Sequence, residues 1–241
     1  MLPSHAMSDT KKVCAVIGVG PGNGAALARR FADDGYAVAL LARSTKTTSD
    51  LARELPAAKA FECDVGDAAS IARAFAAIRG ELGEVDVVVF NAGSGVFGSL
   101  DDVTAADFES AWRANAQGLF LVAKEVVPAM KAARSGAIVV IGATASRRGT
   151  PRATAFAPAK AAQRSLCEAL ARQLGPAGIH VALIIVDGVV DLPKTRERMK
   201  DKPDDFFVKP SGVADLASSL VRQDKSAWTF EAEARPFGET W

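Results

Sequence analysis

Short apolar segments alternate with longer amphipathic segments along almost the whole chain. Seven segments are β-branched or apolar runs bounded by Gly, Asp or Asn, which predicts strands over Val13–Val19, Ala37–Arg43, Lys59–Val65, Val85–Ala92, Gly136–Ala143, His180–Val186 and Ala227–Arg235. Between them, apolar residues recur every three or four positions, which predicts helices over Gly22–Gly35, Thr48–Leu55, Asp67–Leu82, Thr104–Lys131, Thr154–Leu174 and Ser211–Val221. Strands that are apolar on both faces and separated by helices form a parallel sheet covered on both sides. The sequence therefore predicts an α/β, doubly wound Rossmann fold with a seven-stranded, mainly parallel sheet.

No linker, repeat or low-complexity segment divides the 241 residues, a length that suits one large α/β domain. We expect a single domain over residues 13–241, preceded by an extension over residues 1–12 that lacks the apolar core of a signal peptide. The segment Asp187–Pro210 is rich in charge and proline, which predicts a mobile loop over the functional site.

Composition excludes several classes of protein. Lys and Arg number 29 against 28 Asp and Glu, so no overall field favours nucleic acid or an anionic membrane. Mean hydropathy is +0.12, and the longest apolar run is interrupted by polar residues, which argues against a membrane span. Cys14, Cys63 and Cys167 form no CxxC pair, and there are only two histidines. We therefore expect buried thiols in a reducing cytoplasm and no metal site.

A glycine-rich loop joins the first predicted strand to the first helix. Glycines stand at positions 18, 20, 22 and 24, with Asn23 between the last two. Such a loop lets the backbone approach a diphosphate and directs the helix N-terminus at its charge. We expect Gly18, Gly20, Gly22, Asn23 and Gly24 to bind a dinucleotide, and a tight turn without a ligand is the alternative.

The end of the second predicted strand indicates which dinucleotide to expect. An acidic residue there would bind the ribose 2′-hydroxyl of NAD, but residues 42–46 are Ala, Arg, Ser, Thr and Lys. Arg43 can pair with a 2′-phosphate through two hydrogen bonds, and Ser44 can donate another. The sequence predicts NADP(H) as the cofactor, and a solvated surface arginine is the alternative for Arg43.

Three further motifs follow the glycine loop in order. Asp64-Val65 comes after the third predicted strand, Asn91-Ala92-Gly93 after the fourth, and Asn115 lies in the long helix that follows. Together with Gly18-x-x-x-Gly22-x-Gly24, their order and spacing resemble the short-chain dehydrogenase/reductase family over nearly the whole chain.

The resemblance implies roles for these residues. Asp64 and Val65 would line the adenine pocket, and Asn91, Ala92 and Gly93 would support the adenosine side of the cofactor. Ile17 stands where the family usually has Thr, a departure that removes one hydroxyl beneath the glycine loop.

Asn115 places an amide in an apolar helical stripe. Phe108, Trp112, Asn115, Leu119, Val122 and Val126 are spaced three or four residues apart. A buried amide needs hydrogen-bond partners. The resemblance implies that Asn115 organises a water chain to the active-site lysine, and a purely structural amide is the alternative.

The family's catalytic pattern is broken in this chain. Relatives carry Tyr-x-x-x-Lys at the start of a helix and a Ser about thirteen residues earlier, whereas this chain has Phe156, Lys160 and Ala143 at those positions. The resemblance implies that Lys160 binds the nicotinamide ribose and, in relatives, lowers the pKa of the tyrosine. The only tyrosine is Tyr36, which precedes the second predicted strand. Without a phenol, ordinary ketone chemistry is expected to be impaired.

Two residues are candidate replacements for the missing hydroxyls. Thr144 follows Ala143, and Asp187 stands where the family has the Pro of a Pro-Gly pair that meets the nicotinamide, followed here by Gly188 and Val189. Asp187 is either an acid near Lys160 or the cap of its own loop in an Asx turn. The expected catalytic set is Asn115, Lys160, Thr144 and Asp187, and Gly188 and Val189 are expected to contact the cofactor.

Two functions remain open at this point. One is an NADP(H)-dependent oxidoreductase with an altered proton-transfer site, acting on a carbonyl or conjugated substrate. The other is a catalytically silent NADP(H)-binding sensor or partner subunit. Because family members pair their long helices across a two-fold axis, the resemblance also implies a homodimer or homotetramer.

Overall fold

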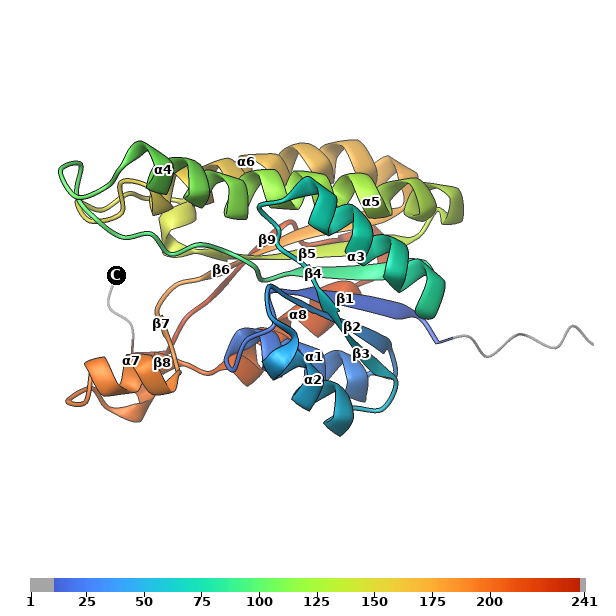
Figure 1. Cartoon of the computed structure of the whole chain (residues 1–241), viewed down its shortest axis with the longest axis horizontal. Coiled ribbons are helices and arrows are strands. Elements are labelled where there is room, and N and C mark those ends of the chain that lie inside the picture. The colour runs from blue at the N-terminus through green and yellow to red at the C-terminus, as the bar shows by residue number, and fades with distance from the viewer. Residues whose placement is uncertain (1–10, 239–241) are drawn as a thin grey trace, which may run out of the picture.

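A seven-stranded parallel sheet runs through the centre of the computed structural model, which describes residues 11–238 (Figure 1). The strand order is β3-β2-β1-β4-β5-β6-β9, and every adjacent pair is parallel. The strands are β1 (Val13–Ile17), β2 (Ala37–Ala42), β3 (Ala58–Glu62), β4 (Val85–Phe90), β5 (Gly136–Ala143), β6 (Ile179–Val186) and β9 (Glu231–Ala234). The chain runs outward from β1 to β3 and then returns to the centre at β4. This reversal makes the sheet doubly wound, as predicted, and leaves a crevice beyond the carboxyl ends of β1 and β4.

Helices cover both faces of the sheet (Figure 1). One face carries α1 (Asn23–Asp33), α2 (Thr45–Glu54) and α8 (Pro210–Val221), and their buried residues form one apolar core with that side of the sheet. The other face carries α3 (Ala68–Glu81), α5 (Gly118–Ala133) and α6 (Phe156–Leu174), which enclose a second core. Because both faces are buried, the central strands are apolar at nearly every position.

The long predicted helix is interrupted at Asn115. The structure has α4 (Ala105–Trp112), a π-helical turn over Arg113–Gln117, and then α5. Leu119 and Asn115 are fully buried as expected, but Phe108 and Trp112 are 45% and 44% exposed. The prediction of one continuous apolar stripe is therefore wrong for these two aromatic residues. The wide turn holds an extra residue, which rotates the following helical face by about 100°.

The segment predicted to be a mobile loop carries its own secondary structure. β7 (Val189–Val190) pairs with β8 (Phe207–Val208), and α7 (Pro193–Arg198) lies between them. Arg196 binds both carboxylate oxygens of Asp191, at 2.7 and 2.8 Å, and packs over the Phe207 ring. These contacts give the segment secondary structure of its own, and its mobility stays a prediction.

The last strand is shorter than predicted. A 3₁₀ turn over Lys225–Ala227 precedes β9, so pairing with β6 begins only at Glu231. Two guanidinium groups hold Glu231 from the neighbouring elements, Arg147 at 2.7 Å and Arg164 at 2.5 Å. These ion pairs connect the strand to the turn after β5 and to α6.

All three cysteines are buried thiols, and burial raises the pKa values of Cys63 and Cys167 to about 12. Within residues 11–238, no group of His, Cys, Asp and Glu is placed to hold a metal ion. The same residues include no helix with the length and apolar character needed to cross a membrane. The extension expected over residues 1–12 lies mostly outside the described residues, and β1 begins at Val13.

We predict that Gly18→Ala lowers the free energy of unfolding by about 2 to 4 kcal/mol. Gly18 has a φ of +86°, and an added Cβ would lie 2.5 Å from the backbone nitrogen of Ala92. Gly20→Ala is the matched control, because no atom lies within 4 Å of its added Cβ. Urea denaturation of the two variants tests this, and equal stability would contradict it.

Candidate functional site

The glycine loop is folded tightly against the sheet. The backbone nitrogens of Gly18 and Val19 both donate to the carbonyl oxygen of Leu41, at 2.9 and 3.0 Å. Gly24 lets α1 approach the loop, because a Cβ there would lie 2.6 Å from the Gly18 carbonyl oxygen. The first turn of α1 has no side-chain cap and no acidic residue. Its free N–H groups therefore form a positive end that suits an anionic group.

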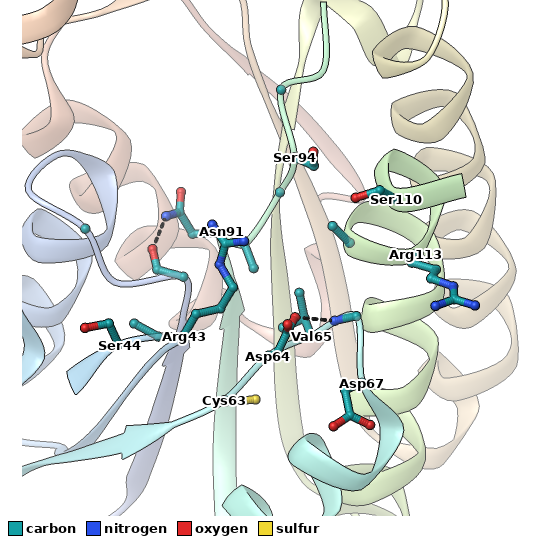
Figure 2. Close-up of a pocket in the computed structure, with 18 of the residues that line it drawn as sticks. Arg43, Ser44, Cys63, Asp64, Val65, Asp67, Asn91, Ser94, Ser110 and Arg113 are labelled. Carbon is teal, nitrogen blue, oxygen red and sulfur yellow. Dashed lines mark hydrogen bonds between the residues drawn. The ribbon is translucent and has the colours of Figure 1, made fainter. Parts of the chain in front are cut away.

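A cleft of about 1030 Å³ opens beside the loop at the carboxyl ends of β1 to β4 (Figure 2). This volume suits a ligand of dinucleotide size. The predicted cofactor residues in its wall are Gly18, Gly20, Arg43, Ser44, Asp64, Val65, Asn91, Ala92 and Gly93. The opposite wall comes from α4 and the π turn, and includes Glu109, Ser110 and Arg113, which the sequence interpretation did not single out.

Arg43 reaches into the cleft from the end of β2 (Figure 2). The side chain is exposed, and within residues 11–238 no carboxylate forms an ion pair with it. Ser44 beside it caps α2 by accepting a hydrogen bond from the backbone nitrogen of Lys46 at 3.4 Å. This corner of the cleft therefore offers a guanidinium and a hydroxyl, which are donors for an anionic oxygen.

Asp64 and Asn91 organise the floor of the cleft (Figure 2). The Asp64 carboxylate accepts a hydrogen bond from the backbone nitrogen of Gly66 at 2.9 Å, which rigidifies the turn after β3. The Asn91 amide nitrogen donates to the Gly18 carbonyl oxygen at 2.8 Å. This bond connects the end of β4 to the glycine loop and fixes the width of the crevice between them.

Five predicted cofactor residues other than Lys160 lie outside the lining of the cleft, namely Gly22, Asn23, Gly24, Gly188 and Val189. Leu192 covers part of this region, because an added Cβ on Gly22 would lie 2.3 Å from its Cδ2 atom. Gly188 instead packs beside Pro236 and Val208. The adenosine side of the expected site is thus open, and the segment after β6 packs over the other side.

Lys160 is buried at the inner end of the site. Its ammonium donates to the Ile141 carbonyl oxygen and to Gln163 Oε1, each at 2.9 Å. Burial lowers the pKa of Lys160 to about 8, because desolvation disfavours the charged form. Gln163 was missed by the sequence interpretation, although a polar residue three positions after Lys160 in a buried helical stripe could have indicated it.

Asn115 is fully buried in the π turn. Its amide nitrogen donates to the carbonyl oxygens of Ala111 and Ser94, at 2.8 and 3.2 Å, while its side-chain oxygen has no hydrogen-bond partner among the described residues. That oxygen would lie 2.8 Å from a Cβ added to Gly93. The amide therefore presents an unused acceptor at the inner edge of the cleft.

Two aromatic rings form an apolar surface at the start of α6. The Phe156 ring lies 4.9 Å from the Phe97 ring, centroid to centroid. The Ala143 backbone nitrogen donates to Ser146 Oγ at 3.2 Å, so the nearby serine is engaged with the backbone. Tyr36 packs against Phe31 at the amino end of β2, on the opposite edge of the sheet. Tyr36 therefore cannot supply a hydroxyl to this site.

Thr144 and Asp187 lie together beside this apolar surface. The Thr144 hydroxyl donates to Asp187 Oδ1, and the Arg148 guanidinium lies 3.9 Å from the same carboxylate oxygen. Asp187 is 91% buried, and its backbone nitrogen donates to the Ala234 carbonyl oxygen at 2.8 Å. The carboxylate thus faces the turn after β5 instead of capping its own loop.

The sequence pattern of the family described as short chain dehydrogenase matches residues 12–203. The chain belongs to this family. It is 31% identical over 219 residues to the 3-oxoacyl-acyl-carrier-protein reductase MabA of Mycobacterium bovis, covering 88% of this chain and 85% of that protein. Membership of a family of oxidoreductases agrees with the nucleotide-binding architecture of the cleft.

Solved structures of two similar proteins share the fold of this chain. A metagenomic short-chain oxidoreductase in complex with NADP has a TM-score of 0.82 and 26% identity, covering 96% of this chain and all of the other. An actinorhodin polyketide ketoreductase with NADPH has a TM-score of 0.85 and 25% identity, with coverages of 94% and 96%. Both comparisons show the single-domain Rossmann fold and associate it with nicotinamide dinucleotides.

The low pKa of Lys160 makes the stability of the protein depend on pH. An unfolded lysine titrates at about 10.4, so between pH 8 and this value the unfolded chain binds more protons than the folded chain. Stability conferred by this group therefore rises with pH across the window. From the lower to the upper end of this window, the free energy of unfolding of the parent should rise on the order of 3 kcal/mol relative to that of Lys160→Met.

Urea denaturation of the parent and Lys160→Met, below and above this window, measures the effect. Taking the difference between the two proteins cancels the titration of other groups. A difference that is constant with pH would show that Lys160 titrates normally in the folded chain.

Proposed function

We propose that the protein is an NADP(H)-dependent oxidoreductase with an altered proton-transfer site, which delivers a hydride to a conjugated or otherwise activated carbonyl substrate. The observation that carries the proposal is the glycine-loop cleft, in which Arg43 stands at the strand end with no carboxylate partner within residues 11–238. When bound, the nicotinamide supplies the hydride. The residues of the chain bind the cofactor, hold the substrate and determine where the proton comes from.

The preference for NADP(H) over NAD(H) rests on charge at the end of β2. A carboxylate there would repel a 2′-phosphate, whereas the exposed Arg43 guanidinium can bind it through two parallel hydrogen bonds. Ser44 adds a hydroxyl donor at the same corner. The NADP and NADPH complexes of the two similar structures support this assignment.

The substrate class follows from the missing phenol. Hydride addition to a simple ketone places negative charge on one oxygen, which needs a proton donor in contact with it. Phe156 cannot donate a proton. In a conjugated enone or enoyl thioester the electron pair is delocalised after hydride addition, so protonation from water can complete the reaction. The rings of Phe156 and Phe97 offer such a planar substrate an apolar surface.

Thr144, Asp187, Lys160 and Asn115 are the polar groups proposed to serve this chemistry. Asp187 orients the Thr144 hydroxyl, which can hold a substrate oxygen after rotation of its own bond. The Lys160 ammonium would supply positive charge at the inner end of the site, where Gln163 connects it to the Asn115 backbone carbonyl. Gly22, Asn23, Gly24, Gly188 and Val189 are proposed to contact the cofactor once Leu192 moves off Gly22.

A catalytically silent NADP(H)-binding protein is the second candidate. The loss of both family hydroxyls, at Ala143 and Phe156, favours it, because a pure binder keeps Lys160 and the glycine loop without needing an acid. The two candidates differ in one observable. Incubation with NADPH and a panel of enones, quinones, enoyl thioesters and ketones, followed by nicotinamide absorbance, should show turnover of conjugated members above the buffer rate. NADPH binding without turnover of any member would favour the silent binder.

We predict that Arg43→Ala weakens NADPH binding about 10- to 100-fold, the value of a lost charge-assisted contact, and leaves NADH binding nearly unchanged. Arg113→Ala is the matched control, because Arg113 lines the opposite wall of the cleft and pairs with Glu109 at 2.7 Å. Fluorescence titration with both cofactors measures the ratio. Equal affinities for NADPH and NADH in the parent would refute the assignment.

We predict that Ala143→Ser combined with Phe156→Tyr raises ketone reduction by roughly 10² to 10⁴. Phe156 begins α6 one turn before Lys160, and the positive charge of the ammonium favours a phenolate, which makes the new phenol a better acid near neutral pH. Ala143→Ser alone is the control and should give no gain. A double variant that binds NADPH normally but reduces no ketone faster than the parent would contradict this prediction.

We also propose a homodimer or homotetramer formed through α5 and α6. A groove of about 370 Å³ between these helices is lined by Phe120, Val127 and Leu170, and Phe120 is 48% exposed. Light scattering should give the mass of a dimer or a tetramer of the 25.1 kDa chain, and Phe120→Glu should shift the measured mass toward that of the monomer. Leu100→Glu, at an exposed site elsewhere, should not. A monomeric parent would contradict the proposed assembly.

Location of the protein in the cytoplasm stays a prediction.

A further inference from the structure

Gln163 is a fully buried amide with both of its polar ends occupied. Its side-chain oxygen accepts a hydrogen bond from the Lys160 ammonium at 2.9 Å, and its side-chain nitrogen donates to the Asn115 backbone carbonyl at 2.9 Å. One amide thus spans the gap between Lys160 on α6 and the π turn. This is the place where the family resemblance implies a chain of water molecules.

An amide and a water molecule differ in what they can do with a proton. A water oxygen accepts a proton on one side and releases another from the same atom, so a chain of waters conducts protons. In Gln163 the acceptor is Oε1 and the donor is Nε2, and passing a proton between them would require an unfavourable imidic acid form. The bridge from Lys160 to Asn115 therefore holds its hydrogen bonds without carrying a proton.

We infer that Gln163 is a positioning residue that anchors Lys160 and takes the place of a proton-conducting water chain, so that the lysine serves this site as a fixed charge and donor. The inference rests on the proposed function for its catalytic meaning. The inference also agrees with the missing tyrosine. A chain without the tyrosine has no phenol for the lysine to reprotonate, so a relay to solvent through Asn115 has no use.

The second acceptor of the ammonium supports the same conclusion. Ile141 contributes its carbonyl oxygen at 2.9 Å, so two of the three N–H groups of Lys160 are bound to fixed protein atoms from β5 and α6. The remaining N–H group is available to a bound cofactor or substrate. Cys167 on α6 is the neighbouring titratable group that acts on Lys160, and burial raises its pKa to about 12, so it stays protonated at neutral pH.

Hydrogen exchange at the Lys160 side chain distinguishes an insulated anchor from a merely structural amide. The full-length chain, with ¹⁵N-labelled lysine and without cofactor or substrate, is followed by NMR, with Lys160→Met assigning the signal. We expect the ammonium protons to exchange more slowly in the parent than at the exposed Lys46, because Lys160 is buried and two of its three N–H groups are bound to protein acceptors. Gln163→Ala makes room for water and should accelerate exchange at least tenfold.

Gln163→Met is the matched variant, because it keeps most of the volume and removes both hydrogen bonds. It should lower the pKa of Lys160 by about one unit, since the charged form loses an acceptor, while exchange stays slower than in Gln163→Ala. Exchange in the parent as fast as at the exposed Lys46 would overturn the inference. So would a Gln163→Ala variant that is folded by circular dichroism and exchanges at the parental rate.

These outcomes are independent of catalysis. Fast exchange in the parent would remove the role of Gln163 and leave the NADP(H)-dependent chemistry untouched. Conversely, an absence of NADPH turnover would end the proposed function and leave the exchange rates as measured. If Gln163→Ala does not fold, the parental exchange rate and the Gln163→Met shift still decide the question.

Discussion

The hydrogen bond from the Asn91 amide to the Gly18 carbonyl oxygen joins the two central strands at the point where the sheet changes direction. Gly18 sits against the backbone of Ala92 so closely that no side chain fits. Because β1 and β4 are held together there, the loops that leave them are forced apart, one toward α1 and the other toward α4. The cleft between these loops, which lies beside the uncapped end of α1, follows from that single constraint.

We propose that the two halves of the site differ from the family to different degrees. The adenosine half keeps its glycines, its strand-end polar residues and a cation at the end of β2, so its electrostatics favour an anionic nucleotide. In the proposed catalytic half, Ala143 and Phe156 carry no hydroxyl group, the Thr144 hydroxyl contacts Asp187, and Gln163 bridges Lys160 and Asn115. Binding and proton transfer are separate physical functions, so the second can change while the first persists.

The sequence was sufficient to predict the fold and most of the cleft, because burial on both faces leaves a clear apolar pattern in the strands and because glycines and strand-end polar residues mark the loops. Three features were beyond that reasoning. The π turn at Asn115 adds a residue without changing the helical composition, so Phe108 and Trp112 turned outward against expectation. The contacts of Gln163 and of Leu192 depend on packing between elements distant in sequence. Arg196 likewise contacts Asp191 and Phe207 within residues 187–210, and the charge and proline content of this segment does not predict these contacts.

The central claim is that a functional nicotinamide site faces a surface that lacks a hydroxyl acid. A crystal structure of the chain with NADP⁺ tests it most directly. We expect the 2′-phosphate on Arg43 and Ser44, the diphosphate at the glycine loop with Leu192 displaced, and the nicotinamide ring beside Phe156, with Lys160 still bonded to Gln163. An empty cleft at saturating NADP⁺, or a nicotinamide ring directed away from Phe156 and Thr144, would contradict it.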